Sequence, residues 1–177
     1  MKHEIICSGF GGQGALTIGK FLAKSAMREG KNVSWLPSYG PEMRGGTANV
    51  AAVISDEMVA SPIVSYPDIL VALNQPSIDK FGPNVKPGGL MVVNTDMCPN
   101  KLDRDDIDII YAPMTSIAKE IGNPKVLNMI SIGMIIGKIG LIKFETIKSD
   151  LSDFLKNKNP DLLELNLIAI KKGMELV

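Results

Sequence analysis

Residues 9–14 read Gly9-Phe10-Gly11-Gly12-Gln13-Gly14, and this stretch decides the fold because of what lies on either side of it. Before it, Glu4 to Ser8 is a short, mostly apolar run that stops at glycine, as a buried strand does. After it, Ala15 to Arg28 carries apolar residues at helical spacing, and Gly30 is placed to end that helix. The stretch is therefore a tight strand-to-helix turn, which is typical of an α/β domain.

The rest of the chain continues the alternation of short apolar strands with helical patterns. Pro37 is expected to end the second strand, and the polar, glycine-rich stretch after it cannot be a regular element. Such an alternation predicts a mostly parallel sheet covered by helices on both faces, a Rossmann-like three-layer domain, with a helical C-terminal third packed on it in one domain over 1–177. The expected strands are 32–36, 47–55, 68–73, 90–94 and 108–111, a helix or loop is expected around 76–81, and the later expected helices are 114–121, 126–139, 144–155 and 160–174.

Composition narrows the class of protein. The chain has 177 residues, enough for one domain with a substantial core, and 45% of them are hydrophobic. Lysine plus arginine equals aspartate plus glutamate at 19 each, so no overall field attracts nucleic acid or an anionic membrane. No apolar run is long enough to span a bilayer, and the N-terminus lacks the pattern of a secretory leader. We expect a cytoplasmic protein that binds neither nucleic acid nor membrane.

The glycine turn predicts an anion site. Gly9, Gly11 and Gly14 fit the G-x-G-x-x-G spacing, and the following helix offers unpaired N–H groups that suit a phosphate or carboxylate. The alternative is that the glycines only permit a tight turn with close helix–strand packing. A nicotinamide dinucleotide would also need an acid at the tip of the second strand; that strand ends without one, and Glu29 comes too early. No G-K-[ST] follows the turn, which excludes a P-loop.

A second polar loop follows the second strand and contributes five further candidate residues. Arg44, flanked by Gly45 and Gly46, can contact a phosphate or carboxylate through two parallel hydrogen bonds. Glu42 can orient that arginine, and Tyr39 can stack or donate a hydrogen bond. Since both loops follow strand ends, we expect them to meet at the carboxyl edge of the sheet. An interface with a partner chain accounts for the same residues equally well.

Cysteine and histidine are too few for a resident metal centre. Cys7 and Cys98 lie 91 positions apart and His3 is the one histidine, whereas a zinc site or iron–sulfur cluster usually takes about four such ligands. Cys7 is expected in the core, and Cys98 in an exposed loop with no neighbouring base to activate it. We therefore predict no metal site and no catalytic residue in this chain.

The two loops together resemble the γ subunit of 2-oxoacid:ferredoxin oxidoreductases. The likeness rests on Gly9-Phe-Gly-Gly-Gln-Gly14 followed by Pro37-Ser-Tyr-Gly-Pro-Glu-Met-Arg-Gly-Gly-Thr-Ala-Asn49. It extends to Ile54-Ser55-Asp56, Ser61-Pro62, Pro67-Asp68-Ile-Leu-Val-Ala-Leu-Asn-Gln75 and Gly88-Gly89, so that it covers nearly the whole chain. The form of the second motif is most similar to the 2-oxoglutarate type, with pyruvate and branched-chain 2-oxoacid relatives next.

That resemblance implies the fold of domain III of pyruvate:ferredoxin oxidoreductase and a role as an accessory subunit that is inactive alone. The complex would decarboxylate a 2-oxoacid, form an acyl-CoA and reduce ferredoxin. Thiamine diphosphate, magnesium and iron–sulfur clusters would be held by α, β and ferredoxin-like δ subunits, and the domain itself would contact coenzyme A. Isolated from its partners, the chain would form a homodimer. A stand-alone nucleotide-binding enzyme and a purely structural adaptor are the alternatives.

Overall fold

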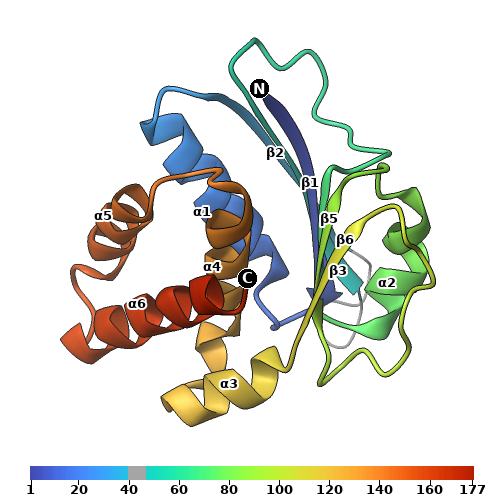
Figure 1. The fold of residues 1–177 in the computed structure, drawn as a ribbon. Helices are drawn as coiled ribbons and strands as arrows, with labels where there is room; N and C mark the ends of the chain where they lie inside the picture. Colours follow the sequence, from blue (N-terminus) through green and yellow to red (C-terminus); the bar gives the residue numbers. More distant parts are fainter. Residues whose placement is uncertain (40–46) are drawn as a thin grey trace.

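The computed structural model describes residues 1–39 and 47–177 of the chain, with only the backbone of Tyr39 (Figure 1). Strands and helices alternate through the first part, and helices alone follow the last strand. The elements are β1 (Lys2–Phe10), α1 (Ala15–Arg28), β2 (Asn32–Tyr39), β3 (Thr47–Ser55), β4 (Ile69–Ala72), α2 (Gln75–Phe81), β5 (Leu90–Asn94), β6 (Asp108–Ala112), α3 (Met114–Ile121), α4 (Leu127–Ile139), α5 (Phe144–Leu155) and α6 (Pro160–Glu175), with 3-10 turns at Gly82–Asn84 and Pro124–Val126.

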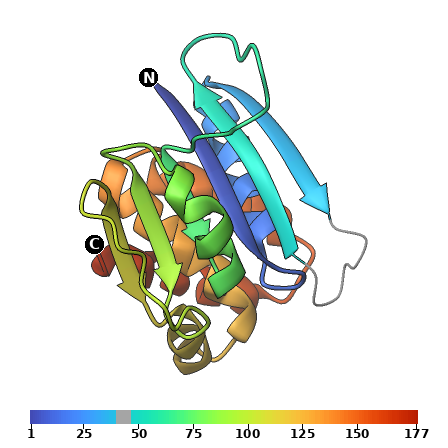
Figure 2. The same cartoon turned by 90° about the vertical axis from the view of Figure 1, so that its right-hand side faces the viewer.

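The six strands form one sheet in the order β2-β3-β1-β4-β5-β6 (Figure 2). The pairings β1–β4, β4–β5 and β5–β6 are parallel, whereas β3 runs antiparallel to both of its neighbours. Because β3 alone is reversed, β2 runs in the same direction as β1. The predicted mostly parallel sheet is confirmed, and the carboxyl ends of five strands lie at one edge.

Alternate residues of the central strands face two apolar clusters, one on each side of the sheet. On one side, Ile5 of β1 packs in the same cluster as Ile18 and Leu22 of α1. On the other side, Ile6 of β1 packs in the same cluster as Ile78 of α2. The helix after β1 and the helix after β4 thus cover opposite faces. This change of side makes the carboxyl ends of β1 and β4 the position where an α/β sheet opens a crevice for ligands.

The helical C-terminal third adds two layers to the α1 side of the sheet. Helix α4 is buried on nearly all sides, since it lies between the sheet and α6. Helices α5 and α6 form the outer layer, with α5 against α1 and α6 across α4 (Figure 1). The opposite face carries α2 and residues of the loops, so the predicted cover on both faces is present but unequal. Within the described residues, no helix is both long and apolar enough to cross a bilayer.

The expected end of the second strand at Leu36 is wrong. Strand β2 continues through Pro37, which pairs with Val50, and ends at Tyr39. Proline cannot donate to a ladder, but β2 is an edge strand, so its free side has no neighbour that needs the missing N–H. The extension carries the chain to the same edge of the sheet as the glycine turn.

Candidate functional site at the carboxyl edge of the sheet

The glycine turn joins the end of β1 to the start of α1. Gly12 has a φ of 96° and Gly14 a φ of 87°, values that side-chain-bearing residues rarely adopt. Gly14 is the N-cap of α1, and the backbone N–H of Gln13 donates to the carbonyl of Phe10 at 3.1 Å, which closes the turn. The predicted strand–turn–helix arrangement is confirmed, and two of its glycines are required by backbone conformation.

The side chain of Gln13 fastens this turn to the next strand of the sheet. Its Oε1 accepts a hydrogen bond from the Phe10 N–H at 2.6 Å, and its Nε2 donates to the carbonyl of Leu73 at 3.1 Å. A Cβ on Gly9 would lie only 2.7 Å from that Oε1 and 2.9 Å from Leu73 Cβ. Only glycine at position 9 therefore leaves room for the Gln13 side chain to reach from the turn to the end of β4. Both polar atoms of Gln13 are engaged by the chain itself, which makes it a residue that positions the turn.

Three backbone N–H groups of the turn are available to a ligand. The N–H groups of Gly11, Gly12 and Gly14 have no acceptor within the described part of the chain. The N-cap of α1 supplies no side-chain acceptor either, and the first turn of the helix contains no acid. An uncapped helix N-terminus next to several free N–H groups is a favourable place for a phosphate or carboxylate. The geometry therefore suits the anion that the sequence predicts.

The second loop begins and ends beside this turn. Ala48 of β3 pairs with Gly9 of β1 on one side and with Tyr39 of β2 on the other, and Thr47 pairs with Phe10. The strand ends that flank the loop therefore lie at the edge where the turn lies (Figure 2). The remaining candidates, Glu42, Arg44, Gly45 and Gly46, lie outside the described residues.

A buried polar group beneath the turn was not predicted from the sequence. The Ser77 hydroxyl lies 2.6 Å from Asn74 Oδ1 and 2.9 Å from the hydroxyl of Ser8, and all three residues are buried. Asn74 also accepts from the Ser77 N–H at 3.0 Å as the N-cap of α2, while its Nδ2 is buried without a partner among the described residues. The available signal was Asn74 at a strand end with Pro76 behind it, the pattern of a capped helix start.

The two cysteines and Glu29 are not part of the candidate site. Burial raises the pKa of the Cys98 thiol to about 12 and also raises the pKa of Cys7, so both thiols stay protonated. Cys98 is buried, contrary to the expectation of an exposed loop residue. Glu29 accepts from the Lys143 N–H and the Thr146 hydroxyl, and so caps α5. Over the described residues, no three His, Cys, Asp or Glu side chains gather as a metal site.

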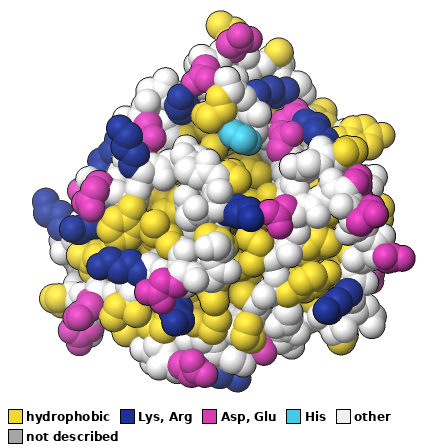
Figure 3. All heavy atoms as spheres, in the orientation of Figure 1, with side chains coloured by type: hydrophobic (Ala, Val, Ile, Leu, Met, Phe, Trp, Pro, Cys, Tyr) yellow, Lys and Arg dark blue, Asp and Glu magenta, His cyan; other side chains and the backbone are white. Residues whose placement is uncertain are grey.

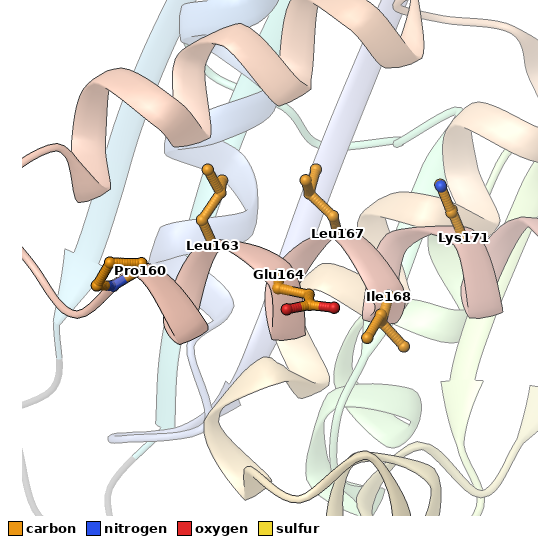
Figure 4. A pocket seen from close by; sticks show the side chains of 6 residues that line it. All are labelled: Pro160, Leu163, Glu164, Leu167, Ile168 and Lys171. Atoms are coloured by element: carbon orange, nitrogen blue, oxygen red, sulfur yellow. The ribbon is translucent and has the colours of Figure 1, made fainter.

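A groove on α6 is separate from this edge. It is open to solvent and has a volume of about 320 Å³, and Leu163, Leu167 and Ile168 line it together with Glu164 and Lys171 (Figure 4). All of its lining residues belong to α6. The face that carries α5 and α6 also shows charges of both signs scattered among apolar side chains (Figure 3). We assign this groove no part in the candidate site.

Residues 4–176 match the family described as pyruvate ferredoxin/flavodoxin oxidoreductase. The chain belongs to that family. Among curated members, the ketoisovalerate oxidoreductase subunit VorA of Methanothermobacter marburgensis is 39% identical over 95% of this chain. The chain spans only 35% of that relative's length. The 2-oxoglutarate synthase subunit KorC of Methanocaldococcus jannaschii is 36% identical and matches almost end to end, over 99% of this chain and 94% of its own.

Solved structures of ferredoxin oxidoreductases share the fold. The γ subunit of a keto/oxoacid ferredoxin oxidoreductase from Geobacter sulfurreducens has a TM-score of 0.81 and 30% identity, with 98% of this chain and 97% of that chain covered. The 2-oxoglutarate:ferredoxin oxidoreductase from Magnetococcus marinus has a TM-score of 0.90 and 26% identity, over 99% of this chain and 31% of that one. That structure contains bound 2-oxoglutarate, coenzyme A and succinyl-CoA.

Proposed function

We propose that this chain is the γ-type subunit of a complex that oxidatively decarboxylates a 2-oxoacid to an acyl-CoA and reduces ferredoxin. The observation that carries the proposal is the end-to-end match to a 2-oxoglutarate synthase subunit, which makes 2-oxoglutarate the first candidate substrate. The relative in which the domain occupies about a third of a longer chain supports an assembly with further polypeptide. We place this assembly in the cytoplasm, with residues 1–177 as one γ-type domain.

We propose that the chemistry at the substrate belongs to partner chains. Cys7 and Cys98 are both buried with raised pKa values, so these two thiols do not form an open ligand set for an iron–sulfur cluster. Thiamine diphosphate, magnesium and the clusters are accordingly assigned to α, β and ferredoxin-like δ subunits. This chain supplies no catalytic residue and is inactive alone.

The part we assign to this chain is to hold coenzyme A at the carboxyl edge of the sheet. The free N–H groups of Gly11, Gly12 and Gly14 would contact phosphate oxygens at the uncapped start of α1. Gly9 and Gln13 would keep that turn against β4. From the second loop, Arg44 would pair with a further phosphate and Glu42 would orient it, while Tyr39, Gly45 and Gly46 complete the surface.

A Gln13→Ala variant in the assembled complex tests this assignment. The change removes the hydrogen bonds to Phe10 and Leu73 but leaves every N–H of the turn in place. We expect KM for coenzyme A to rise about fivefold, equivalent to about 1 kcal/mol, while KM for the 2-oxoacid is unchanged. Gln75→Ala is the matched control, because Gln75 bonds Asp79 and Asn100 on the other side of β4. An unchanged KM for coenzyme A in Gln13→Ala would contradict the assignment.

Three further measurements separate the alternatives. Arg44→Ala in the complex distinguishes a ligand site from an adaptor: loss of assembly with normal acyl-CoA formation in the residual complex favours the adaptor. Titration of the isolated chain with NAD, NADP and coenzyme A tests the stand-alone enzyme, and micromolar NAD binding would overturn the subunit proposal. Native pull-down provides the independent check, since recovery without a thiamine-binding partner argues against both subunit roles.

We also propose that the isolated chain pairs with a second copy through the surface meant for its partners. Met58, Ile63 and Tyr66, in the segment between β3 and β4, are 89%, 67% and 62% exposed. Exposed apolar side chains that occur together in one segment are typical of protein contacts. Light scattering that shows a monomer would contradict the pairing without affecting the assignment of the turn.

A further inference from the structure

A cavity lies within the helical layers, on the α1 side of the sheet. It has a volume of about 180 Å³, is partly open to solvent, and is lined from α1, the 3-10 turn before α4, α4 itself, α5 and α6. The side chains of Phe21, Met129 and Leu151 contribute to its lining and are themselves buried. An apolar cavity of about 150 Å³ can hold a benzene molecule. This cavity therefore has room for an apolar group of about six carbon atoms.

Polar and positively charged side chains complete the lining. Lys125 and Lys158 both take part and no acidic residue does, while Asn123 and Asn166 add carboxamides. The Lys158 ammonium lies 4.7 Å from the centre of the Phe154 ring, which holds it over the apolar wall of the cavity. Neither lysine forms an ion pair with a described residue. The cavity thus combines an apolar wall with two exposed lysines that form no ion pair with a described residue.

We propose that this cavity, the helix-layer pocket, binds a small carboxylate that carries an apolar tail of about six carbon atoms. The tail would lie against Phe21, Met129 and Leu151, where it leaves water. The carboxylate would lie toward Lys125 and Lys158, which offer charge-assisted hydrogen bonds. A ligand of the same shape with an ammonium group would instead meet two like charges. The pocket is distinct from the turn assigned to coenzyme A, and its occupation does not depend on that assignment.

One side chain connects the helix-layer pocket to the glycine turn. Asn128 lines the pocket and also lies against Gly14, because a Cβ on Gly14 would be 3.1 Å from both the Cβ and the Nδ2 of Asn128. A ligand that moves Asn128 therefore changes the surroundings of Gly14 directly. Binding in the pocket should be visible at the amide of Gly14, although that residue does not line the pocket.

Titration of the full chain with hexanoate, followed by NMR, tests the proposal. We expect saturable shifts of the Met129 and Leu151 methyl groups and of the Gly14 amide, with a Kd of about 1 mM for so small a ligand. Hexylammonium tests the sign of the charge and acetate tests the need for a tail, and neither should produce these shifts. Absence of saturable shifts with hexanoate, or equal shifts with hexylammonium, would overturn the proposal.

A pair of lysine variants gives the matched comparison. Lys158→Gln removes a charge that lines the pocket, whereas Lys156→Gln removes one from the same exposed segment outside the pocket. We expect Lys158→Gln to weaken hexanoate binding about threefold and Lys156→Gln to leave it unchanged. Equal weakening in both variants would mean nonspecific attraction. Unchanged binding in both Lys158→Gln and Lys125→Gln would mean that these lysines do not hold the carboxylate. Either result overturns the proposal.

Discussion

The turn after β1 and the crossing of α4 with α6 both depend on glycine, but on different properties of it. In the turn, Gly12 has a positive φ and open space around it, so what is needed there is backbone conformation. At the crossing, a Cβ on Gly133 would overlap the carbonyl oxygen of Ile170, and a Cβ on Gly173 would overlap that of Ile130. What is needed at the crossing is the absence of volume.

The difference separates a region built for stability from one left open for a ligand. At the crossing, the missing side chains let two helix backbones touch, and the space between them is filled by the protein itself. In the turn, the glycines leave N–H groups without an acceptor among the described residues. The helix crossing, whose space is filled by the protein itself, should therefore tolerate little change in side-chain volume. A substitution in the ligand-binding turn should therefore reduce ligand affinity more than it reduces the stability of the fold.

The largest expected effect is at the crossing. Gly133→Ala forces α4 and α6 apart along their whole contact, and we expect the free energy of unfolding to fall by about 3 kcal/mol. Urea denaturation at neutral pH measures it. Gly12→Ala is the control, since it adds the same methyl group where nothing lies within 4 Å, and backbone strain alone should lower stability by about 1 kcal/mol. Equal losses in the two variants would erase the distinction between the regions.

A smaller effect is expected where α5 meets α1. Asp150 is fully buried; it accepts a hydrogen bond from the Ser25 hydroxyl at 2.6 Å and lies 3.4 Å from the Arg28 Nε. Asp150→Ala leaves that hydroxyl buried and unpaired, so we expect a loss of about 2 kcal/mol. Asp153→Ala is the matched control on the same helix. Asp153 also pairs with Arg28 but is 57% exposed, and solvent screening means that its loss should leave stability nearly unchanged.

The Asp150→Ala variant also tests whether the helical layers and the glycine turn are independent of each other. If the helical layers only support the fold, Asp150→Ala should leave KM for coenzyme A unchanged in whatever complex still assembles. A rise in that KM as large as the one expected for Gln13→Ala would show that the layers and the turn act together. Either outcome shows whether the helical layers affect the turn.

How far the sequence predicts the fold depends on how local each signal is. The turn at residues 9–14 was predicted in its context because a strand pattern, glycine spacing and a helix pattern are contiguous. The end of β2 was missed because Pro37 is tolerated on an edge strand, and the sequence does not say which strand lies at the edge. The reversed direction of β3 was likewise not predictable, because strand direction depends on which strands pair and not on the residue pattern within a strand.

The candidate site shows the same limit. Gln13 was predicted at the turn, but its partner Leu73 lies 60 residues away, so its positioning role could not be seen in the sequence. The group formed by Ser8, Asn74 and Ser77 was missed for a similar reason, because β1 and the start of α2 meet only in the folded sheet. Helical glycines such as Gly133 look unremarkable until the crossing places Ile170 beside them.

The smallest expected effect lies at the opposite end of β1 from the turn. Burial lowers the pKa of His3 below its ordinary value of 6.5, and the N-terminal ammonium and Lys86 act in the same direction, whereas Asp68 acts against them. The folded chain therefore binds fewer protons at His3 than the unfolded chain does. The contribution to stability is present above pH 6.5 and is lost as the pH falls through the lowered folded value. His3→Gln should flatten stability against pH in that window.

The His3 variant tests the claim that the two edges of the sheet differ in function. Glu4 and Asp56 also have lowered pKa values and titrate in acid, so the quantity to compare is the difference between wild type and His3→Gln at each pH, from urea unfolding. In the assembled complex, KM for coenzyme A should be the same in both, because His3 lies at the amino edge of the strand whose carboxyl end bears the turn. A His3→Gln variant with a raised KM, or with the pH profile of the wild type, would show that the amino edge contributes to binding or that His3 is not held neutral by the fold.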